Sequence, residues 1–321
     1  MNIPRRHFAH LPTPVDALPT LTARLGGPNL LVKRDDQPGL ALGGNKTRKL
    51  EFLVADAQAR GADLLITGGA AQSNHCRQTA AAAARFGLDC TLVLAGEPPQ
   101  RASANLILDQ LLGANIVWTL PDARDETMAR VEEEARTVGR TPYLIPYGGS
   151  NEIGALGYVF AMQELIAQGV DADWIVVASS SGGTQAGLAV GARLFGYQGR
   201  ILGISIDKPE VELSRDVVAA LATRTARHLG ESIRFSAGDI LVKDDYLGGG
   251  YGMMGEPEIE AIQLFARTEA LLLDPVYTGR AAAGLLDLIR QGFFKRDETV
   301  LFWHTGGTPV LFADRYSGEL V

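Results

Sequence analysis

The chain has 321 residues, of which 46% are apolar and 21% charged, and its formal net charge is −7. These values are typical of a soluble globular protein with one large or two medium domains, and the scattered basic residues argue against nucleic acid or an anionic membrane as a partner. No apolar run approaches the ~20 residues of a membrane span, and the two cysteines, Cys76 and Cys90, form neither a disulfide framework nor a metal site by spacing, so we expect a cytoplasmic protein with reduced thiols.

Short apolar strands alternate with helices in the first half of the chain. The proline-fixed start, residues 10–14, is expected to run across a surface or an interface. Continuous apolar strands separated by helices indicate a parallel sheet that is covered on both faces. Strands are expected at residues 30–35, 63–69, 90–94 and 115–118, and helices from about 45 to 57, 73 to 86, 104 to 112 and 122 to 138.

The same alternation restarts in the second half. Residues 142–151 look like a return segment between two subdomains. Beyond this segment we expect strands at residues 174–178, 201–206 and 300–303, and helices at 152–168, 184–195, 211–229, 258–269 and after 279. The pattern therefore predicts a two-lobed α/β protein, and we see no internal repeat.

The candidate reactive residue is Lys46, where the strand at 30–35 gives way to a helix that begins near Asn45. In a first helical turn the unpaired N–H groups and the helix dipole disfavour a positive charge, so this amine is well placed to lose a proton. A neutral amine can form a Schiff base with an aldehyde. The alternative is a phosphate-contacting or solvated lysine beside a tight turn, and residues 43–51 alone leave both interpretations open.

Gly182, Gly183 and Thr184 open a helix directly after the strand at 174–178. Ligands of parallel open sheets bind at the carboxyl ends of the strands, and the backbone N–H groups of a helix start face an anion there. This turn is therefore a candidate phosphate site, although glycines in such turns are as often only geometric. Its spacing is neither that of a Walker motif nor that of a dinucleotide fingerprint.

Polar side chains also stand in other loops at this edge. Ser73, Asn74 and His75 open a helix and could bind a carboxylate or a planar oxygen, with a capping serine beside a structural histidine as the alternative. Tyr251 and Tyr277 lie beside glycines, where a phenol can donate or accept a proton, although core or surface tyrosines are commoner. No constellation has the spacing of a metal site, and no Gly-x-Ser-x-Gly sequence occurs.

An ordered set of motifs resembles the pyridoxal-phosphate enzymes of fold type II, the tryptophan-synthase β fold. The branch that it resembles contains aminocyclopropane-carboxylate deaminase, D-cysteine desulfhydrase and L-cysteate sulfo-lyase. The likeness covers essentially the whole chain and is carried by residues 33–36, 43–51, 72–75, 148–158, 274–279 and 304–307. It implies a three-layer αβα fold with a larger cofactor-binding domain (1–50 and 155–321), a smaller α/β domain (51–154) and the active site between them.

The resemblance also implies a role for each matching position. Lys46 would hold pyridoxal 5'-phosphate covalently, and Asn74 would bond its phenolic oxygen. Ser73 and His75 would lie by the substrate carboxylate. The remaining roles are the phosphate site (Ser181, Gly182, Gly183 and Thr184), two tyrosines that approach the substrate (Tyr251 and Tyr277), a residue facing the pyridine nitrogen (Thr278) and a further substrate contact (Asn74). Thr308 lies in a loop that departs from the desulfhydrases of the branch, and we expect its added hydroxyl to lie near the substrate.

Thr278 favours one reaction of the branch over the others. The deaminase is expected to place a glutamate at this position, and a hydroxyl cannot keep the ring nitrogen protonated as a carboxylate would. A weaker electron sink suits immediate loss of a good β-leaving group. We therefore expect β-elimination from a cysteine-like amino acid, giving pyruvate, ammonium and either sulfide (from D-cysteine) or sulfite (from L-cysteate), with Lys46 or a tyrosine-assisted Ser73 as the base.

The choice between the two leaving groups stays open. A sulfonate would need extra donors, which Ser180, Ser181, Gln185 and Thr308 could supply. An aminocyclopropane-carboxylate deaminase or an amino-acid racemase is the alternative in the same scaffold. A non-catalytic or nucleotide-binding α/β protein is the remote alternative. The family resemblance further implies a homodimer with a small amino-acid substrate.

Overall fold

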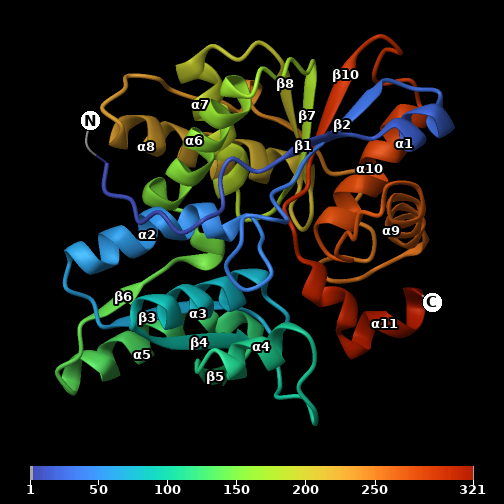
Figure 1. Ribbon diagram of the computed structural model, residues 1–321. Coiled ribbons are helices and arrows are strands. Elements are labelled where there is room, and N and C mark those ends of the chain that lie inside the picture. The colour runs from blue at the N-terminus through green and yellow to red at the C-terminus, as the bar shows by residue number, and fades with distance from the viewer. Residues whose placement is uncertain (1–2, 321) are drawn as a thin grey trace.

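Two sheets, one above the other in Figure 1, organise the computed structural model, which describes residues 3–320. The larger sheet has six strands in the order β1-β2-β10-β7-β8-β9. All of its neighbouring strands are parallel except β1 and β2, which are antiparallel. Its strands are β1 (Val15–Ala17), β2 (Asn29–Lys33), β7 (Trp174–Ser179), β8 (Arg200–Ser205), β9 (Leu241–Lys243) and β10 (Thr299–Trp303).

The smaller sheet has four parallel strands in the order β5-β4-β3-β6. Its strands are β3 (Leu64–Ala70), β4 (Asp89–Ala95), β5 (Asn115–Thr119) and β6 (Pro142–Leu144). Strand β6 lies within residues 142–151, where the sequence predicted a return segment. It adds an edge strand to β3 before the chain crosses back to the larger sheet.

Helices cover both faces of the larger sheet. One face packs against α1, α9 and α10, and the other against α6 and α7. A π-helical turn (Glu212–Ala219) leads into α8 and packs beside α7. The helices of this larger lobe are α1 (Pro19–Leu25), α6 (Glu152–Ala167), α7 (Gly183–Phe195), α8 (Ala220–His228), α9 (Glu256–Glu269), α10 (Thr278–Arg290) and α11 (Asp314–Leu320).

The smaller sheet is covered in the same way, and alternation along β3 explains why. Leu65 points to the side of α2 and α3, while Leu64 and Ile66 pack on the opposite side against α5. The continuous apolar run of this strand thus serves two cores, as expected for a buried parallel strand. The helices are α2 (Lys46–Ala59), α3 (Asn74–Phe86), α4 (Asn105–Leu111) and α5 (Arg124–Thr137).

Helix α2 lies between the two sheets (Figure 1) and packs against α6, which in turn packs against α7 on the larger sheet. Glycines allow the backbones to approach closely: a Cβ added at Gly157 of α6 would lie 2.5 Å from Arg48 O of α2. A Cβ added at Gly191 of α7 would lie 2.7 Å from Val159 O of α6. These contacts fix the start of α2, which carries Lys46, relative to the start of α7.

A buried ionic network ties the same helices to the larger sheet. Arg48 lies 2.8 Å from Asp35 and 2.8 Å from Glu164, and Lys33 lies 2.6 Å from Glu164. Asp35 is fully buried; burial opposes its ionisation, but the Arg48 guanidinium outweighs this and holds its pKa at about 2. The proline-fixed start joins this network through Thr13, whose hydroxyl donates to Asp35 over 2.8 Å.

The four strands of the smaller sheet come from residues 64–144 and the six strands of the larger sheet from 15–33 and 174–303. The predicted domain limits (1–50 and 155–321; 51–154) are compatible with this partition, although the limits themselves stay a prediction. Over residues 3–320, every helix is too short or too polar to span a bilayer.

Candidate active site

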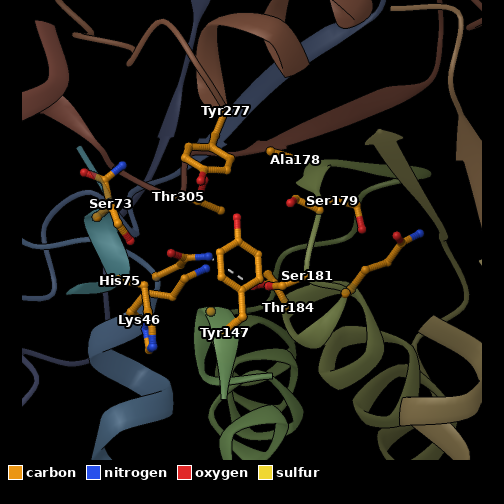
Figure 2. Close-up of a pocket in the computed structure, with 17 residues that line it drawn as sticks. Lys46, Ser73, His75, Tyr147, Ala178, Ser179, Ser181, Thr184, Tyr277 and Thr305 are labelled. Carbon is orange, nitrogen blue, oxygen red and sulfur yellow. Dashed lines mark hydrogen bonds between the residues drawn. The ribbon is translucent and has the colours of Figure 1, made fainter. Parts of the chain in front are cut away.

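A cavity opens at the carboxyl ends of strands from both sheets. Its walls come from the segments that follow β3, β7 and β10, and from the first turn of α2 (Figure 2). The position agrees with the rule that ligands of open parallel sheets bind beyond the strand ends. Residues lining the cavity include Asn45, Lys46, Ser73, Asn74, His75, Tyr147, Gly148, Ala178, Ser179, Ser180, Ser181, Gly182, Thr184, Gln185, Tyr277, Thr305 and Gly306.

Lys46 is the first residue of α2, as the sequence predicted, and its side chain extends into the cavity (Figure 2). Burial disfavours its charged form and lowers its pKa to about 8, while the Asp274 carboxylate acts in the opposite direction. At pH 7 about a tenth of this amine is therefore neutral, a far greater share than in an ordinary lysine. A neutral amine in a closed cavity is the nucleophile needed for Schiff-base formation.

The turn before α7 builds an anion site opposite Lys46. Gly182 has φ +78°, and Gly183 begins the helix, so the N–H groups of its first turn are free of intrahelical partners. Thr184 Oγ1 accepts a hydrogen bond of 3.0 Å from Asn45 Nδ2, which ties the turn to the N-cap residue of α2. A Cβ added at Gly183 would lie 2.5 Å from Ser150 Oγ, so only glycine leaves this approach open.

Lys49 adds a positive group to the anion site. Its Nζ donates to Gly148 O over 3.1 Å and to Ser150 Oγ over 3.2 Å, and both partners are neutral. The side chain is fully buried, and burial, together with the charge of Lys46, holds its pKa well below that of an ordinary lysine. A Cβ added at Gly183 would lie 2.8 Å from Lys49 Nζ, so the amine stands directly beside the glycine turn.

These features fit a phosphate dianion. A buried amine without a carboxylate partner is costly unless an anion neutralises it. The start of a 13-residue helix provides N–H donors and a favourable dipole at the same place. The buried hydroxyls of Ser179 and Ser180 also have no hydrogen-bond partner among residues 3–320. The cavity thus offers unsatisfied hydrogen-bonding groups to an aldehyde that carries a phosphate.

Ser73, Asn74 and His75 line the cavity wall that faces the smaller lobe. Ser73 caps α3, and its hydroxyl accepts from Cys76 N over 3.2 Å. The sequence left two interpretations of Ser73 open, a capping residue or a ligand-binding residue. Both fit the structure, since this serine is an N-cap and also lines the cavity. Cys76, like Cys90, is a free and buried thiol.

The ring of His75 has a defined tautomer. Thr67 Oγ1 donates its single proton to Ile145 O over 2.8 Å, so His75 Nε2, 2.9 Å from the same hydroxyl, must be the donor in their contact. Burial and the nearby Lys46 and Lys49 charges keep the pKa of this ring well below its usual value. His75 Nδ1 is consequently an acceptor, and it has no partner among the described residues.

Tyr251 and Tyr277 form a hydrogen-bonded pair, with 2.5 Å between their hydroxyl oxygens and 6.0 Å between ring centroids. Burial, reinforced by neighbouring phenols, raises both pKa values well above the ordinary value, so both groups stay protonated and can donate. Tyr277 reaches the cavity itself. Tyr251 lines the adjoining cleft, which shares Tyr147 and Ser181 with the cavity.

Like Tyr251 and Gly183, the predicted site residues Thr278 and Thr308 lie outside the cavity lining. Thr278 is the buried first residue of α10, and its hydroxyl donates to Asp274 Oδ1 over 2.8 Å and accepts from Asp274 N over 2.7 Å. Thr308 lies in a neighbouring groove together with Leu42 and Phe312. Thr305, which follows β10, does line the cavity, as does Thr184.

Other residues of the site escaped the sequence analysis. Tyr147 stands between Lys46 and the glycine turn, with its hydroxyl directed toward Tyr277 (Figure 2). The Arg124 guanidinium lies 4.5 Å from the centroid of its ring. Tyr147 belongs to residues 142–151, which sequence reasoning treated as a connection. Lys49 could have been predicted from the sequence, because it lies one helical turn after Lys46 and therefore on the same face of α2.

Comparison with known proteins agrees with this geometry. Residues 7–306 match the family described as pyridoxal-phosphate dependent enzyme. A D-cysteine desulfhydrase of Klebsiella pneumoniae subsp. pneumoniae is 44% identical over 97% of this chain and 96% of its own length. Another D-cysteine desulfhydrase, from Klebsiella pneumoniae strain 342, is 43% identical over the same shares of the two chains.

Solved structures give the same result. A structure described as an ACC deaminase homologue superposes with a TM-score of 0.88 at 37% identity and covers 99% of this chain and 96% of that one. A pyridoxal 5'-phosphate-dependent aspartate racemase, 19% identical with a TM-score of 0.65, shares the fold over 92% of this chain and 90% of its own. The predicted branch, fold type and cofactor are confirmed: the chain belongs to the family of pyridoxal-phosphate dependent enzymes of fold type II, and its cofactor is pyridoxal 5'-phosphate.

Proposed function

We propose that this enzyme is a carbon–sulfur lyase that removes sulfide from D-cysteine by β-elimination, leaving pyruvate and ammonium. The observation that carries the proposal is the 44% identity to a D-cysteine desulfhydrase over 97% of the chain. The buried Lys46 amine, which faces an anion site in one cavity, supports the same chemistry.

The residues that would hold the cofactor come from both lobes. Lys46 would bind its aldehyde carbon. The first turn of α7 and Lys49 would bind its phosphate, and Asn74 would bond its phenolic oxygen. When bound, pyridoxal phosphate withdraws electrons from the α-carbon of an amino acid and so lowers the barrier to losing the α-proton. Everything else in the reaction falls to the side chains of the cavity.

Proton transfer is assigned to three of these side chains. Lys46 Nζ, with a pKa of about 8, would take the α-proton as general base, with Ser73 as the other candidate from the sequence. Tyr277, a protonated phenol hydrogen-bonded to Tyr251, would give a proton to the departing sulfur. The sulfur then leaves as hydrogen sulfide, and the three-carbon enamine that remains takes up water to give pyruvate and ammonium.

Substrate orientation is assigned to the wall opposite the phosphate turn. The Asn74 amide and the Ser73 hydroxyl would bind the substrate carboxylate. His75 Nδ1, as an acceptor, is suited to the substrate ammonium or to an ordered water rather than to the carboxylate. Thr278 stays a prediction for the residue nearest the ring nitrogen, since its hydroxyl is shared with Asp274.

L-Cysteate has less support as the substrate than D-cysteine. The hydroxyl that favoured a sulfonate, that of Thr308, lies in the neighbouring groove and not in the cavity. Ser180, Ser181 and Gln185 do line the cavity, but they surround the proposed phosphate site. Aminocyclopropane-carboxylate deamination and racemisation remain alternatives to be tested in the same scaffold.

A turnover assay with four substrates tests the proposal. D-cysteine, L-cysteine, L-cysteate and aminocyclopropane-carboxylate are compared by measuring sulfide, sulfite, pyruvate and 2-oxobutanoate. We expect sulfide and pyruvate in equal amounts from D-cysteine, and their loss in Lys46→Ala. Sulfite from L-cysteate, or 2-oxobutanoate from the cyclopropane, at a higher kcat/KM than the D-cysteine reaction would contradict the assignment.

The homodimer implied by the family resemblance is part of this proposal. Light scattering of the purified enzyme should give twice the 34.3 kDa of the chain. A mass equal to that of one chain across a range of concentrations would remove the dimer from the proposal without affecting the reaction.

A further inference from the structure

Three buried side chains of the smaller lobe form a continuous hydrogen-bonded relay that ends at the cavity. Arg77 of α3 donates from Nε to Asn105 Oδ1 over 2.9 Å. Asn105, the first residue of α4, donates from Nδ2 to Asn74 Oδ1 over 2.8 Å. Arg77 and Asn105 are fully buried, and only Asn74 lines the cavity.

The relay determines which way each amide points. A guanidinium has donors and no acceptor, so the atom of Asn105 that faces Arg77 must be its oxygen. The nitrogen of Asn105 then faces Asn74, and it also donates to Gln72 O over 2.9 Å. Since that nitrogen needs an acceptor, Asn74 must present its oxygen to Asn105 and turn its own NH₂ group away.

The NH₂ group of Asn74 faces the strand-end side of the cavity. A Cβ added at Gly307, in the segment that follows β10, would lie 2.8 Å from Asn74 Nδ2. The orientation of the Asn74 amide is therefore set by Arg77, which can only donate hydrogen bonds, and Asn105 transmits this constraint to Asn74. Without the relay, an asparagine side chain could present either its oxygen or its nitrogen to a ligand at similar cost.

We propose that Arg77 and Asn105 are positioning residues that hold Asn74 as a hydrogen-bond donor toward the phenolic oxygen of the cofactor. The inference rests on the role proposed above for Asn74. A donor stabilises that oxygen as an anion, whereas an acceptor in the same place favours its protonated form. Arg77 and Asn105 thus set the protonation state of the bound cofactor through Asn74, without touching the cofactor themselves.

Arg77 also links the relay to residues 41–43, which precede Lys46. Its two remaining nitrogens donate to Ala41 O and Gly43 O, in the turn that leads into α2. Both residues have positive φ, +50° and +67°, so this turn depends on external support. Arg77 substitutions would therefore disturb two features at once, and Asn105 is the residue that tests the relay alone.

The decisive variant is Asn105→Asp, nearly isosteric but unable to donate when ionised. Next to the Arg77 guanidinium the new carboxylate is ionised at pH 8 and keeps the contact with Arg77. Asn74 must then turn its NH₂ group toward residue 105 and its oxygen toward the cofactor. We expect the visible absorption band of the lysine-bound cofactor to move to shorter wavelength, and cofactor affinity to fall by about tenfold.

A double-mutant cycle separates an effect on the orientation of the Asn74 amide from a general disturbance of the fold. In an Asn74→Ala background, Asn105→Asp should change neither the spectrum nor the affinity further, because no amide remains to be turned. Asn115→Asp, in strand β5 of the same lobe, is the matched control and should leave both unchanged. If Asn105→Asp fails to fold, Asn105→Ala releases the same amide and should give a mixture of the two bands.

The wild-type band on the folded Asn105 variants, or the same spectral shift with and without Asn74, would overturn the inference. Its failure is distinguishable from failure of the proposed function. The spectrum reports the cofactor's protonation whether or not D-cysteine is the substrate, and the turnover assay on the unmodified enzyme does not depend on the relay.

Discussion

Lys46 and Lys49 lie one helical turn apart on α2, and burial lowers the pKa of both. The Asp274 carboxylate partly offsets the cost for Lys46, whereas the Lys49 amine donates hydrogen bonds only to the neutral Gly148 carbonyl and Ser150 hydroxyl among residues 3–320. The first amine is thus suited to covalent attachment and the second to an incoming anion. Two identical side chains take different roles because their neighbours differ.

The pKa of Lys46 leads to a pH prediction for cofactor attachment. Only the neutral amine attacks an aldehyde, so the rate of attachment to the cofactor-free protein should rise with pH and level off above about 8. Because the folded pKa lies below the unfolded value of about 10.4, charging Lys46 lowers stability at acidic and neutral pH. This cost should disappear as pH rises from about 8 toward 10.

Stopped-flow absorbance across this pH range measures the rate. Asp274→Asn should move the midpoint to lower pH, because the carboxylate raises the pKa of Lys46. A rate that stays flat through the midpoint would mean that the amine is not the titrating group.

Replacing Lys49 tests the anion site directly. Lys49→Met keeps the length of the side chain but removes its charge, so we expect cofactor affinity to fall about ten- to a hundredfold. The cofactor-free protein should lose little stability, because an unneutralised buried amine is removed. Titration of the apoprotein by tryptophan fluorescence and thermal unfolding measure the two effects. Lys243→Met, at a partly exposed lysine near Asp245, is the control and should change neither.

At the scale of elements, the long apolar strands and the main helices were predictable. Leu64–Ala70 and Trp174–Ser179, for example, are continuous apolar runs that end in small residues, and both are strands within one or two residues of the prediction. The elements β1, β6, β9, α1 and α11 were missed. Each has between three and seven residues, too few for either periodicity to be visible, and depends on pairing or packing with distant segments.

The helix start at Gly183 carries a prediction of its own. Gly183→Ala would place a methyl group 2.5 Å from Ser150 Oγ and 2.8 Å from Lys49 Nζ, so either the turn or both side chains must move. We expect cofactor affinity to fall by at least tenfold with secondary structure unchanged, as measured by apoprotein titration and circular dichroism. Gly318→Ala in α11, where an added Cβ meets nothing within 4 Å, is the matched control. Unchanged affinity in Gly183→Ala would argue that the phosphate lies elsewhere.

At the scale of the whole molecule, the Asp35 network joins the N-terminal segment, β2, α2, α6 and β10. Asp35 accepts hydrogen bonds from Arg48, from Tyr158 over 2.7 Å and from Trp303 over 2.9 Å. Asp35→Asn removes one of the two carboxylates that pair with the buried Arg48 guanidinium and leaves Glu164 as the other, so we expect a loss of about 2–3 kcal/mol in the free energy of unfolding. Asp245→Asn, at the exposed end of a weak ion pair, should change it by less than about 0.5 kcal/mol.

Acid unfolding provides a second measure of this network. The pKa of Asp35 is lowered to about 2, below its unfolded value of about 3.9, so its contribution is present above pH 4 and is lost as pH falls toward 2. Asp35→Asn should therefore flatten the stability profile in this interval. Denaturant unfolding at several pH values tests this, and an unaltered acid slope would mean that other carboxylates dominate.

Residues of the candidate site were predictable only where polar or reactive side chains follow the end of a predicted apolar strand. Ser73 and Gly182 each follow such a strand, and Lys46 opens the helix after one. Thr305 follows the predicted apolar strand β10 and could have been found in this way, whereas Tyr147 could not, because the strand before it, β6, has only three residues and was not predicted. Thr308 illustrates the converse: two residues beyond a cavity-lining glycine, the chain has already turned into another groove.

The glycine contacts among α2, α6 and α7 have a consequence for ligand selection. The backbone of α6 packs closely against α2 and against α7, so this packing holds the distance from the Lys46 nitrogen to the amides at the start of α7 nearly constant when a ligand binds. The cavity therefore selects ligands by their length. Pyridoxal phosphate can reach both Lys46 and the amides before α7. Free pyridoxal, which lacks the phosphate, or a homologue one methylene longer cannot bind at both places together.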